Sequence, residues 1–448
     1  MTTVTAPAVR PYEHYVYAYP HKTAYRALPQ RPALRELWAG QAKDALSLYL
    51  HIPFCEVRCG FCNLFTRIGA PEGLTTAYLD ALERQAGAVR EALSGPGGTE
   101  PRYAAAAFGG GTPTFLTAAE LERLCDIAEK TAGADLRAVP LSVEASPSTA
   151  TADRLAVLAD RGATRLSLGV QSFVPEEARA AVRPQKRAEV EAALGRVRDA
   201  RIPVLNIDLI YGIDGQTEES WRYSLDAALA WRPEELYLYP LYVRPLTGLG
   251  RRPDEPAAAW DEQRLRLYRA GRDHLLAAGY EQVSMRMFRL PDAPASAADD
   301  YACQTDGMVG LGCGARSYTS ELHYSFDYAV DMREIRGIVD DYVARPRADF
   351  ARAEYGRWID GDEARRRHLM QSLLQAAGLP VAEYRERFGS LPREDFPAEL
   401  AGFEARGWTE ERAGLLRLTP EGLAHSDAVG PALFSPEVRA AMAAYERK

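Results

Sequence analysis

The feature that most constrains the fold is a repeat of short apolar runs alternating with amphipathic stretches between residues 46 and 280. The strand-like runs are SLYLHI (47–52), YAAAAFG (103–109), LSVEA (141–145), RLSLGVQ (165–171), VLNIDLI (204–210) and ELYLYPL (235–241). Helix-like stretches lie between these runs. One covers 75–93, with Thr75 or Thr76 as its cap, and another begins at the capping box of Thr117 and Glu120. The others cover 151–161, 187–200, 218–231 and 262–279. Such units predict an α/β fold with a parallel sheet and outer helices. Periodicity alone leaves an incomplete barrel and an open doubly wound sheet as alternatives.

Polar residues gather where these predicted strands end. The cysteine-rich segment follows the first strand, and GGGTPT (109–114) follows the second. Glu144 ends the third strand, Gln171 ends the fourth, and Asp208 lies late in the fifth. Because the carboxyl ends of parallel strands share one edge, we expect these residues to form a site there.

Three of the six cysteines, Cys55, Cys59 and Cys62, lie within eight positions of each other. Six cysteines in 448 residues are too few for a disulfide framework, so metal binding or redox chemistry is the expectation. Structural zinc usually takes four protein ligands. Three thiolates suit a 4Fe–4S cluster with one iron open to another ligand, with zinc as the alternative.

The run Tyr49-Leu-His51-Ile-Pro-Phe-Cys55 with Cys59-x-Phe61-Cys62 resembles the radical S-adenosylmethionine (SAM) superfamily. It is similar to the oxygen-independent coproporphyrinogen III oxidase branch, which includes haem chaperones and class C methyltransferases. The resemblance spans about residues 45–320 and continues through GGGTPT (109–114), LSVEASP (141–147), LSLGVQSF (166–173), Arg183-Pro-Gln185, NIDLIYGI (206–213) and GLGCGARS (310–317). It implies a partial (β/α)6 barrel core, and the C-terminal segment suggests a small winged-helix-like α+β domain.

The resemblance also implies the cofactors and their contacts. A 4Fe–4S cluster on the three cysteines binds SAM and cleaves it reductively to methionine and a 5′-deoxyadenosyl radical. Positions resembling contacts to this SAM are Tyr49, Gly110 and Glu144, and those resembling contacts to a second SAM are Phe61, Thr112, Gln171, Arg183 and Asp208. Gly109, Gly110 and Gly111 would let a ligand approach the backbone closely, the alternative being a tight turn. The resemblance assigns no residue as general acid or base.

Two departures from the branch guide the functional expectation. Porphyrin-oxidising members carry a fourth cysteine where this chain has Leu64, and haem chaperones carry a His-Asn pair where this chain has Tyr301–Asp306 without histidine. The leading expectation is therefore two-SAM methylation or another modification of a small organic substrate. Tetrapyrrole oxidation and haem carriage are the alternatives.

Four segments are expected along the chain: an aromatic arm (1–44), the radical SAM core (45–290), a substrate-side extension (291–364) and the winged-helix-like domain (365–448). The arm either packs on the body in extended form or covers a substrate mouth. Residues 286–300 read as a connector. Cys303 and Cys313 flank the substrate side, as buried small residues or as a radical-quenching thiol or iron ligand.

Composition sets limits on partners and location. The net charge of −8 argues against general nucleic-acid binding. No run of about 20 apolar residues is present, which argues against a membrane span. The N-terminus shows no secretory signal, so a cytoplasmic location is expected. An electron donor such as flavodoxin or ferredoxin is the expected protein partner.

Overall fold

The computed structural model describes residues 10–95, 100–183, 185–250, 257–294 and 303–445. Residues 1–9 of the expected arm and 295–300 of the expected connector lie outside the described residues, as do Pro184, Tyr301 and Ala302.

Six parallel strands form the centre of the main sheet, and they correspond to the six predicted runs within one or two residues. They are β2 (Leu46–Ile52), β5 (Tyr103–Gly110), β6 (Leu141–Ala145), β7 (Ala163–Gln171), β8 (Val204–Tyr211) and β9 (Glu235–Pro240). Each pairs with the next in chain order, so the sheet is built by repeated parallel crossovers. The prediction of an α/β fold with an incomplete barrel is confirmed.

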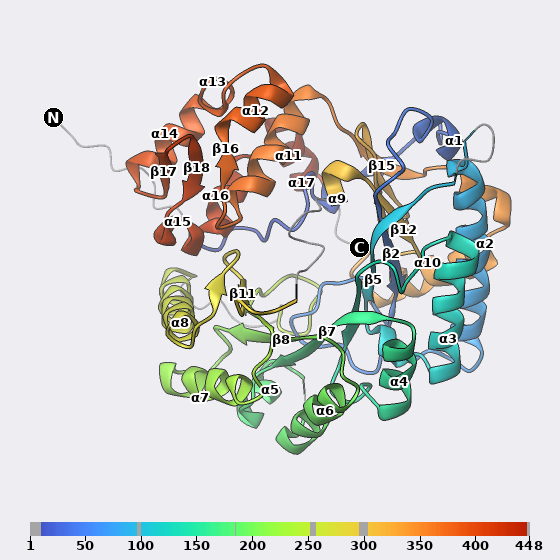
Figure 1. Ribbon diagram of the computed structural model, residues 1–448, viewed down its shortest axis with the longest axis horizontal. Helices are drawn as coiled ribbons and strands as arrows, with labels where there is room; N and C mark the ends of the chain where they lie inside the picture. The colour runs from blue at the N-terminus through green and yellow to red at the C-terminus, as the bar shows by residue number, and fades with distance from the viewer. Residues whose placement is uncertain (1–9, 96–99, 184, 251–256, 295–302, 446–448) are drawn as a thin grey trace.

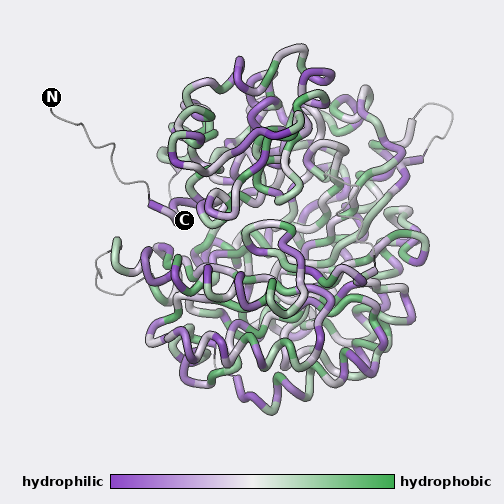
Figure 2. Tube along the Cα trace, turned by 60° about the vertical axis from the view of Figure 1, so that its left-hand side comes forward, coloured by the Kyte–Doolittle hydropathy of each residue, from purple (hydrophilic) through white to green (hydrophobic). Residues whose placement is uncertain are grey.

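Helices cover the outer face of these strands (Figure 1). They are α2 (Leu74–Leu93), α3 (Ala118–Asp126), α4 (Ala152–Asp160), α5 (Pro175–Ala180), α6 (Arg187–Asp199), α7 (Glu218–Leu229) and α8 (Ala257–Ala277), with η2 (Pro113–Phe115) before α3 and the π-helix η3 (Ile127–Ala132) after it. Hydrophilic and hydrophobic residues alternate along them (Figure 2). The capping box of Thr117 and Glu120 is present. The cap expected at Thr75 or Thr76 was wrong: Gly73, with φ +80°, is the N-cap of α2.

Alternation along the strands separates a packed face from a polar face. Leu48 and Leu50 of β2 and Leu166 and Leu168 of β7 are fully buried on the packed face. The intervening positions are polar, and Tyr49 and Asp208 remain partly accessible. Successive side chains of a strand point to opposite faces, so the positions between these leucines face the inside of the incomplete barrel.

The sheet extends beyond the six predicted strands. Among the described residues it has thirteen strands in the order β1-β15-β14-β13-β12-β2-β5-β6-β7-β8-β9-β11-β10. The added strands are β1 (Arg26–Ala27), β10 (Glu281–Gln282), β11 (Met287–Arg289), β12 (Met308–Leu311), β13 (Arg316–Tyr318), β14 (Leu322–Ser325) and β15 (Tyr355–Trp358). Within the expected connector, β11 pairs with β9. Short elements beside the sheet are η1 (Lys22–Ala24), α1 (Leu34–Leu37), β3 (Phe54–Cys55), β4 (Arg67–Ile68), α9 (Cys303–Asp306), α10 (Met332–Ala344) and η5 (Arg347–Ala351).

The C-terminal segment forms a second hydrophobic core, centred on Leu369, Leu373, Tyr384 and Phe396. Its helices are α11 (Gly361–Leu373), α12 (Val381–Phe388), α13 (Pro392–Asp395), α14 (Pro397–Ala405), α15 (Pro420–Ala424), α16 (Ser426–Ala432) and α17 (Pro436–Ala443). Its three-stranded sheet contains β16 (Leu379–Pro380), β18 (Leu415–Leu418) and β17 (Thr409–Arg412). Helices with a small antiparallel sheet make the expected winged-helix-like arrangement, drawn in orange and red in Figure 1.

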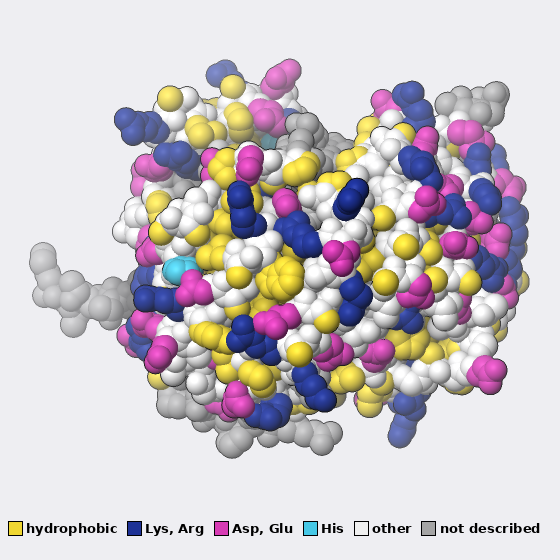
Figure 3. Space-filling model, turned by 60° about the horizontal axis from the view of Figure 1, so that its bottom comes forward, with side chains coloured by type: hydrophobic (Ala, Val, Ile, Leu, Met, Phe, Trp, Pro, Cys, Tyr) yellow, Lys and Arg dark blue, Asp and Glu magenta, His cyan; other side chains and the backbone are white. Residues whose placement is uncertain are grey.

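Two surface properties bear on the expected partners. On the face shown in Figure 3, basic and acidic side chains are interspersed, without a broad area of one sign. Within the described part of the chain, no helix has both the length and the apolar character needed to span a bilayer.

Candidate radical SAM site

The cysteine loop, residues 55–62, lies directly after β2 and is held by backbone hydrogen bonds. Gly60 N donates to Ala181 O (3.0 Å), and Leu249 N donates to Gly60 O (2.8 Å). A Cβ atom at Gly60 would lie 2.7 Å from Val182 Cγ2, so the close approach requires glycine. The loop is therefore fixed between two neighbouring segments of the core.

The three thiols lie in polar but poorly hydrated surroundings. Cys55 Sγ is 3.3 Å from Thr112 Oγ1, and Cys59 Sγ accepts a hydrogen bond from Arg183 Nη1 (3.1 Å). Burial raises the pKa of Cys55 to about 12 and also raises the pKa of Cys62. Metal-bound cysteines are thiolates, so the positive charge of iron would offset this desolvation.

The number of thiols bears on the choice between zinc and a cluster. A structural zinc site usually takes four protein ligands, whereas three thiolates can hold a 4Fe–4S cluster and leave one iron open. The donor set of three cysteines on one anchored loop fits the cluster.

The glycine turn after β5 lies against the cysteine loop. Gly110 has φ +112°, and a Cβ atom there would lie 2.5 Å from the His51 ring. Its N–H donates to Glu144 Oε2 (3.0 Å), whereas Gly111 N donates to Ile52 O (2.8 Å). These amides are thus already used within the protein, so the glycines serve chiefly as a tight turn that packs β5 onto the loop.

Glu144 lies near the end of β6, beside the glycine turn. Its carboxylate is accessible to water, yet protein atoms surround it closely enough to limit its hydration. Burial raises its pKa to about 7, the Gly110 N–H opposes this rise, and the charge of Asp208 adds to it. Tyr49 borders the same space, because a Cβ atom at Gly109 would lie 3.1 Å from Tyr49 Oη and 3.0 Å from Glu144 Oε2. The space beside Gly109 is therefore bordered by a hydrogen-bond acceptor, the Glu144 carboxylate, and by the Tyr49 phenol; we call it the SAM corner.

Asp208 lies two strands further along. Ser167 Oγ donates to it (3.1 Å), and so does Asn206 Nδ2 (2.7 Å). Burial raises its pKa, and the hydrogen bonds oppose that rise. Asn206 Oδ1 has no partner among the described residues, which leaves one buried acceptor for a ligand.

Gln171 and Arg183 meet above Gly169. Gln171 adopts φ +71° at a bulge between β7 and β8, a conformation uncommon for residues other than glycine. Arg183 Nη2 donates to Gly169 O (2.6 Å), while its Nη1 reaches Cys59. Phe61 packs from the other side against a small apolar cluster that includes Ile210. The predicted contacts therefore lie along one rim that begins at the cysteine loop.

The N-terminal arm, expected either to pack on the body or to cover a substrate mouth, lies beside β9 and β13. The Tyr15 ring lies 6.4 Å from the Tyr239 ring of β9 and 3.8 Å from the Arg286 guanidinium carbon. The Arg316 guanidinium carbon lies 4.7 Å from the Tyr17 ring centroid. The density of tyrosines in the arm was the only available signal, because the arm residues are neither periodic nor adjacent in sequence to these partners.

The remaining sequence candidates have ordinary surroundings. Cys313 is buried, with its Sγ 3.9 Å from Tyr78 Oη, and Cys303 is partly accessible. Gln304 holds the arm, since its Oε1 accepts from Tyr19 N (2.9 Å) and its Nε2 donates to Tyr17 O (3.4 Å). The residue that replaces the haem chaperones' motif is therefore occupied in docking the arm.

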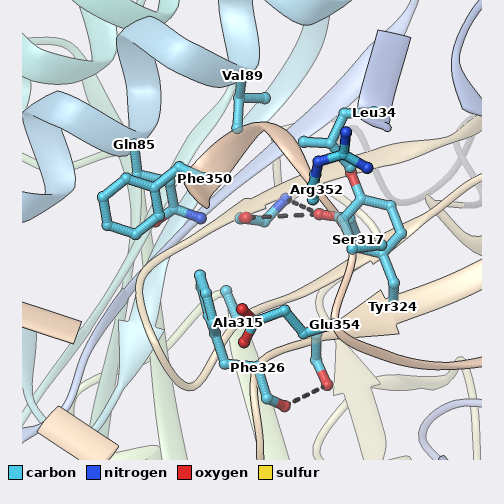
Figure 4. A pocket seen from close by; sticks show the side chains of 13 residues that line it. Leu34, Gln85, Val89, Ala315, Ser317, Tyr324, Phe326, Phe350, Arg352 and Glu354 are labelled. Atoms are coloured by element: carbon cyan, nitrogen blue, oxygen red, sulfur yellow. Dashed lines mark hydrogen bonds between the residues drawn. The ribbon is translucent and has the colours of Figure 1, made fainter. Parts of the chain in front are cut away.

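A separate small pocket lies between α2 and the β13–β15 region (Figure 4). Gln85, Ser317, Phe326 and Glu354 are among the residues that line it, and its volume is about 20 Å³. This space holds little more than a water molecule. None of the predicted site residues lines it.

Comparison with known proteins agrees with this geometry. The radical SAM superfamily profile matches residues 49–228, and the profile of the HemN C-terminal domain matches residues 359–425. An oxygen-independent coproporphyrinogen III oxidase from Pseudomonas aeruginosa is 30% identical over 417 residues, covering 90% of this chain and 84% of that protein. The fold and the cysteine motif define a radical SAM protein.

Two further matches concern the branch. The heme chaperone HemW from Bacillus subtilis is 25% identical over 382 residues, covering 84% of this chain and 96% of that protein. The structure of coproporphyrinogen III oxidase (HemN) from Escherichia coli matches with a TM-score of 0.78 and 24% identity, over 94% and 96% of the two chains. The chain belongs to the oxygen-independent coproporphyrinogen III oxidase-like branch of the radical SAM superfamily.

Membership settles the cofactor class and changes the functional expectation. The protein uses a 4Fe–4S cluster and SAM. The named relatives favour the alternative expectations, tetrapyrrole oxidation or haem carriage, over methylation.

Proposed function

We propose that this protein is a radical SAM oxidase that acts on the propionate side chains of a coproporphyrinogen-like tetrapyrrole. The observation that carries the proposal is the full-length similarity to the Pseudomonas aeruginosa oxidase, which covers 90% of this chain. The similarity thus extends beyond the radical SAM core to the segments around the rim. This chain has Leu64 at the position of the fourth cysteine of porphyrin-oxidising members, so the proposed oxidation would proceed without a thiol at that position.

Cys55, Cys59 and Cys62 would hold the cluster, which when reduced supplies the electron for reductive cleavage of SAM. The Glu144 carboxylate would accept hydrogen bonds from the ribose or ammonium of that SAM, and Tyr49 would border it. Gly110 keeps Glu144 oriented through its N–H, 3.0 Å from Oε2. The arm tyrosines would limit access of water to the site.

The second group of rim residues would hold a second SAM. Support comes from the buried acceptor Asn206 Oδ1, which lacks a partner among described residues, and from Asp208 beside it. Arg183 lies between this group and the cluster loop through its contact with Cys59 Sγ. The further members of the group are Phe61, Thr112 and Gln171. A donor such as flavodoxin or ferredoxin would deliver the electron.

The test is an anaerobic product assay on the reconstituted protein with dithionite, SAM and coproporphyrinogen III. Mass spectrometry would follow 5′-deoxyadenosine, S-adenosylhomocysteine and vinyl products from loss of CO2. We expect 5′-deoxyadenosine and vinyl products together, with no S-adenosylhomocysteine. Tight haem binding with little SAM cleavage would instead favour the haem-carrier function, and S-adenosylhomocysteine formation would favour methylation.

Matched variants test the cluster ligands in the same assay. Cys59→Ala should lose the brown colour and all SAM cleavage while keeping its far-UV circular dichroism. Cys125→Ala, at a buried cysteine of α3, is the control and should keep its iron. Iron and activity retained in Cys59→Ala would contradict the ligand assignment.

A further inference from the structure

Three cations near the rim lack carboxylate partners. Arg316 begins β13, and its Nη1 has no hydrogen-bond partner among the described residues. Lys22, in the arm, forms no ion pair there either; its Nζ lies 3.7 Å from the Tyr328 ring centroid and 6.0 Å from the Tyr17 ring centroid. Arg367 of α11 is 3% exposed, and its Nη1 faces His323 Nε2 at 2.9 Å. Each comes from a different segment: the sheet, the arm or the C-terminal domain.

The neighbours of these cations are tyrosines. Arg316 lies against the Tyr17 ring, and its other near neighbours are the neutral phenols of Tyr318, Tyr25 and Tyr49. Burial and the charge of Arg316 push the pKa of Lys22 well below its usual value, and the Cys62 thiol opposes this shift. Tyrosine rings attract a cation but do not neutralise it. Arg316, whose pKa is raised, therefore keeps its positive charge without a carboxylate partner among the described residues.

Buried arginines elsewhere in the protein are paired. Among the described residues, Arg286 contacts Asp427 at 2.5 Å, and Arg67 contacts Asp340 at 2.6 Å. Arg264 is paired with Asp261. Arg316 and Lys22 are half-buried, and Arg316 Nη1 is buried without a partner among the described residues. Since a poorly hydrated unpaired charge is costly, the departure from this pattern indicates that a ligand supplies the negative charge.

We infer that Arg316 and Lys22 form a carboxylate-binding subsite, with Tyr17 between them and Arg367 adding positive charge from behind. The inference rests on the proposed function for its substrate: the subsite would hold a propionate of the tetrapyrrole other than the reacting one. Arg316 begins β13, which lies two strands from Tyr49 of β2 in the sheet order β13-β12-β2, so the subsite adjoins the SAM corner. The methionyl carboxylate of SAM is the second source of the same chemistry.

The experiment uses the full-length protein reconstituted with its cluster, as wild type, Arg316→Met, Lys22→Met and Arg316→Lys. Arg266→Met, at an exposed arginine of α8, is the control for charge loss. Thermal stability would be measured in citrate and in chloride at equal ionic strength. We expect citrate to stabilise the wild type and Arg266→Met, but not Arg316→Met or Lys22→Met. In chloride, Arg316→Met should melt above the wild type because it removes an uncompensated buried charge.

Ligand titrations then identify the source of the carboxylate. Coproporphyrin III should bind Arg316→Met roughly tenfold to a hundredfold more weakly than wild type, while its tetramethyl ester should bind both equally. Arg316→Lys should retain most of the affinity. If Arg316→Met instead weakens SAM but not decarboxylated SAM, the subsite holds the SAM carboxylate.

Two outcomes separate this inference from the proposed function. Citrate stabilisation that depends on Arg316, without any binding of coproporphyrin III, would support the subsite and contradict the proposed substrate. Equal citrate stabilisation of wild type, Arg316→Met and Lys22→Met, with unchanged affinities for coproporphyrin III and SAM, would overturn the subsite.

Discussion

Glu144 shows how one residue acquires a pKa suited to its position. A strand end places it at the rim, the Gly110 N–H orients it, and the surrounding protein limits its hydration. Its charged form is therefore disfavoured until a ligand donates hydrogen bonds to it. A ligand that donates hydrogen bonds to this carboxylate would therefore favour its charged form.

This arrangement predicts a pH-dependent stability difference for Glu144→Gln in the absence of SAM. The folded-state pKa of about 7 lies above the ordinary value of 4.5, so the folded state binds the proton more tightly. The stabilisation that the protonated Glu144 side chain gives the folded state is complete below about pH 4.5 and is lost as pH rises through about 7. Relative to the wild type, Glu144→Gln should therefore be more stable at pH 8 than at pH 5, as measured by thermal melting. Glu122→Gln, at an exposed position of α3, is the control and should show no such trend. A similar trend in Glu122→Gln would show that the pH dependence does not come from Glu144.

Residues at strand ends could be found from the sequence, whereas those that meet the site from elsewhere could not. Glu144 and Asp208 were identified because parallel strands bring their carboxyl ends to one edge. Arg316 and Lys22 lie 294 positions apart, and their proximity depends on docking of the arm against β13. The local sequence around either residue gives no indication of that contact.

At the scale of elements, the turn between β5 and η2 joins the glycine segment to the cysteine loop. Gly110 combines a positive φ with a Cβ position 2.5 Å from the His51 ring. Gly110→Ala should lower the free energy of unfolding by roughly 2–4 kcal/mol, since it adds both backbone strain and overpacking.

Urea denaturation of the variant and wild type would measure this difference. Gly40→Ala provides the control, because an added Cβ there meets nothing within 4 Å. Equal stability of Gly110→Ala and Gly40→Ala would show that the turn accommodates a side chain.

The accuracy of the sequence prediction differed between long and short elements. The six parallel strands were located closely because each combines apolar residues with a turn signal. β11 was missed because a strand of three residues has too little pattern to stand out from a connector. β12 joins the sheet beside β2, and this pairing is determined by tertiary packing rather than by its four residues.

At the scale of the whole molecule, a buried ion pair joins the core to the C-terminal domain and the arm. Arg286 and Asp427 are 6% and 1% exposed, and their charged groups lie 2.5 Å apart. Tyr242 Oη donates to the same carboxylate (2.6 Å), and His14 N donates to Asp427 O (3.1 Å). The Tyr15 ring covers the guanidinium of Arg286.

Asp427→Ala should destabilise the protein by about 3–5 kcal/mol, because it leaves Arg286 buried without a counter-charge. Glu421→Ala is the matched control: it removes the 2.5 Å contact to Arg269, where both side chains are at least 40% exposed, and should cost at most about 1 kcal/mol. Denaturant titration compares the two variants, and similar losses would mean that burial of the Arg286 pair does not matter.

The meeting of residues 14, 286 and 427 also sets an order of events during synthesis. The arm leaves the ribosome before the core, yet its contact with Asp427 cannot form until residue 427 has been translated. A nascent or prematurely terminated chain can complete the six-stranded core while the arm stays undocked. The surroundings in which a radical would be sheltered are thus the last part of the molecule to assemble.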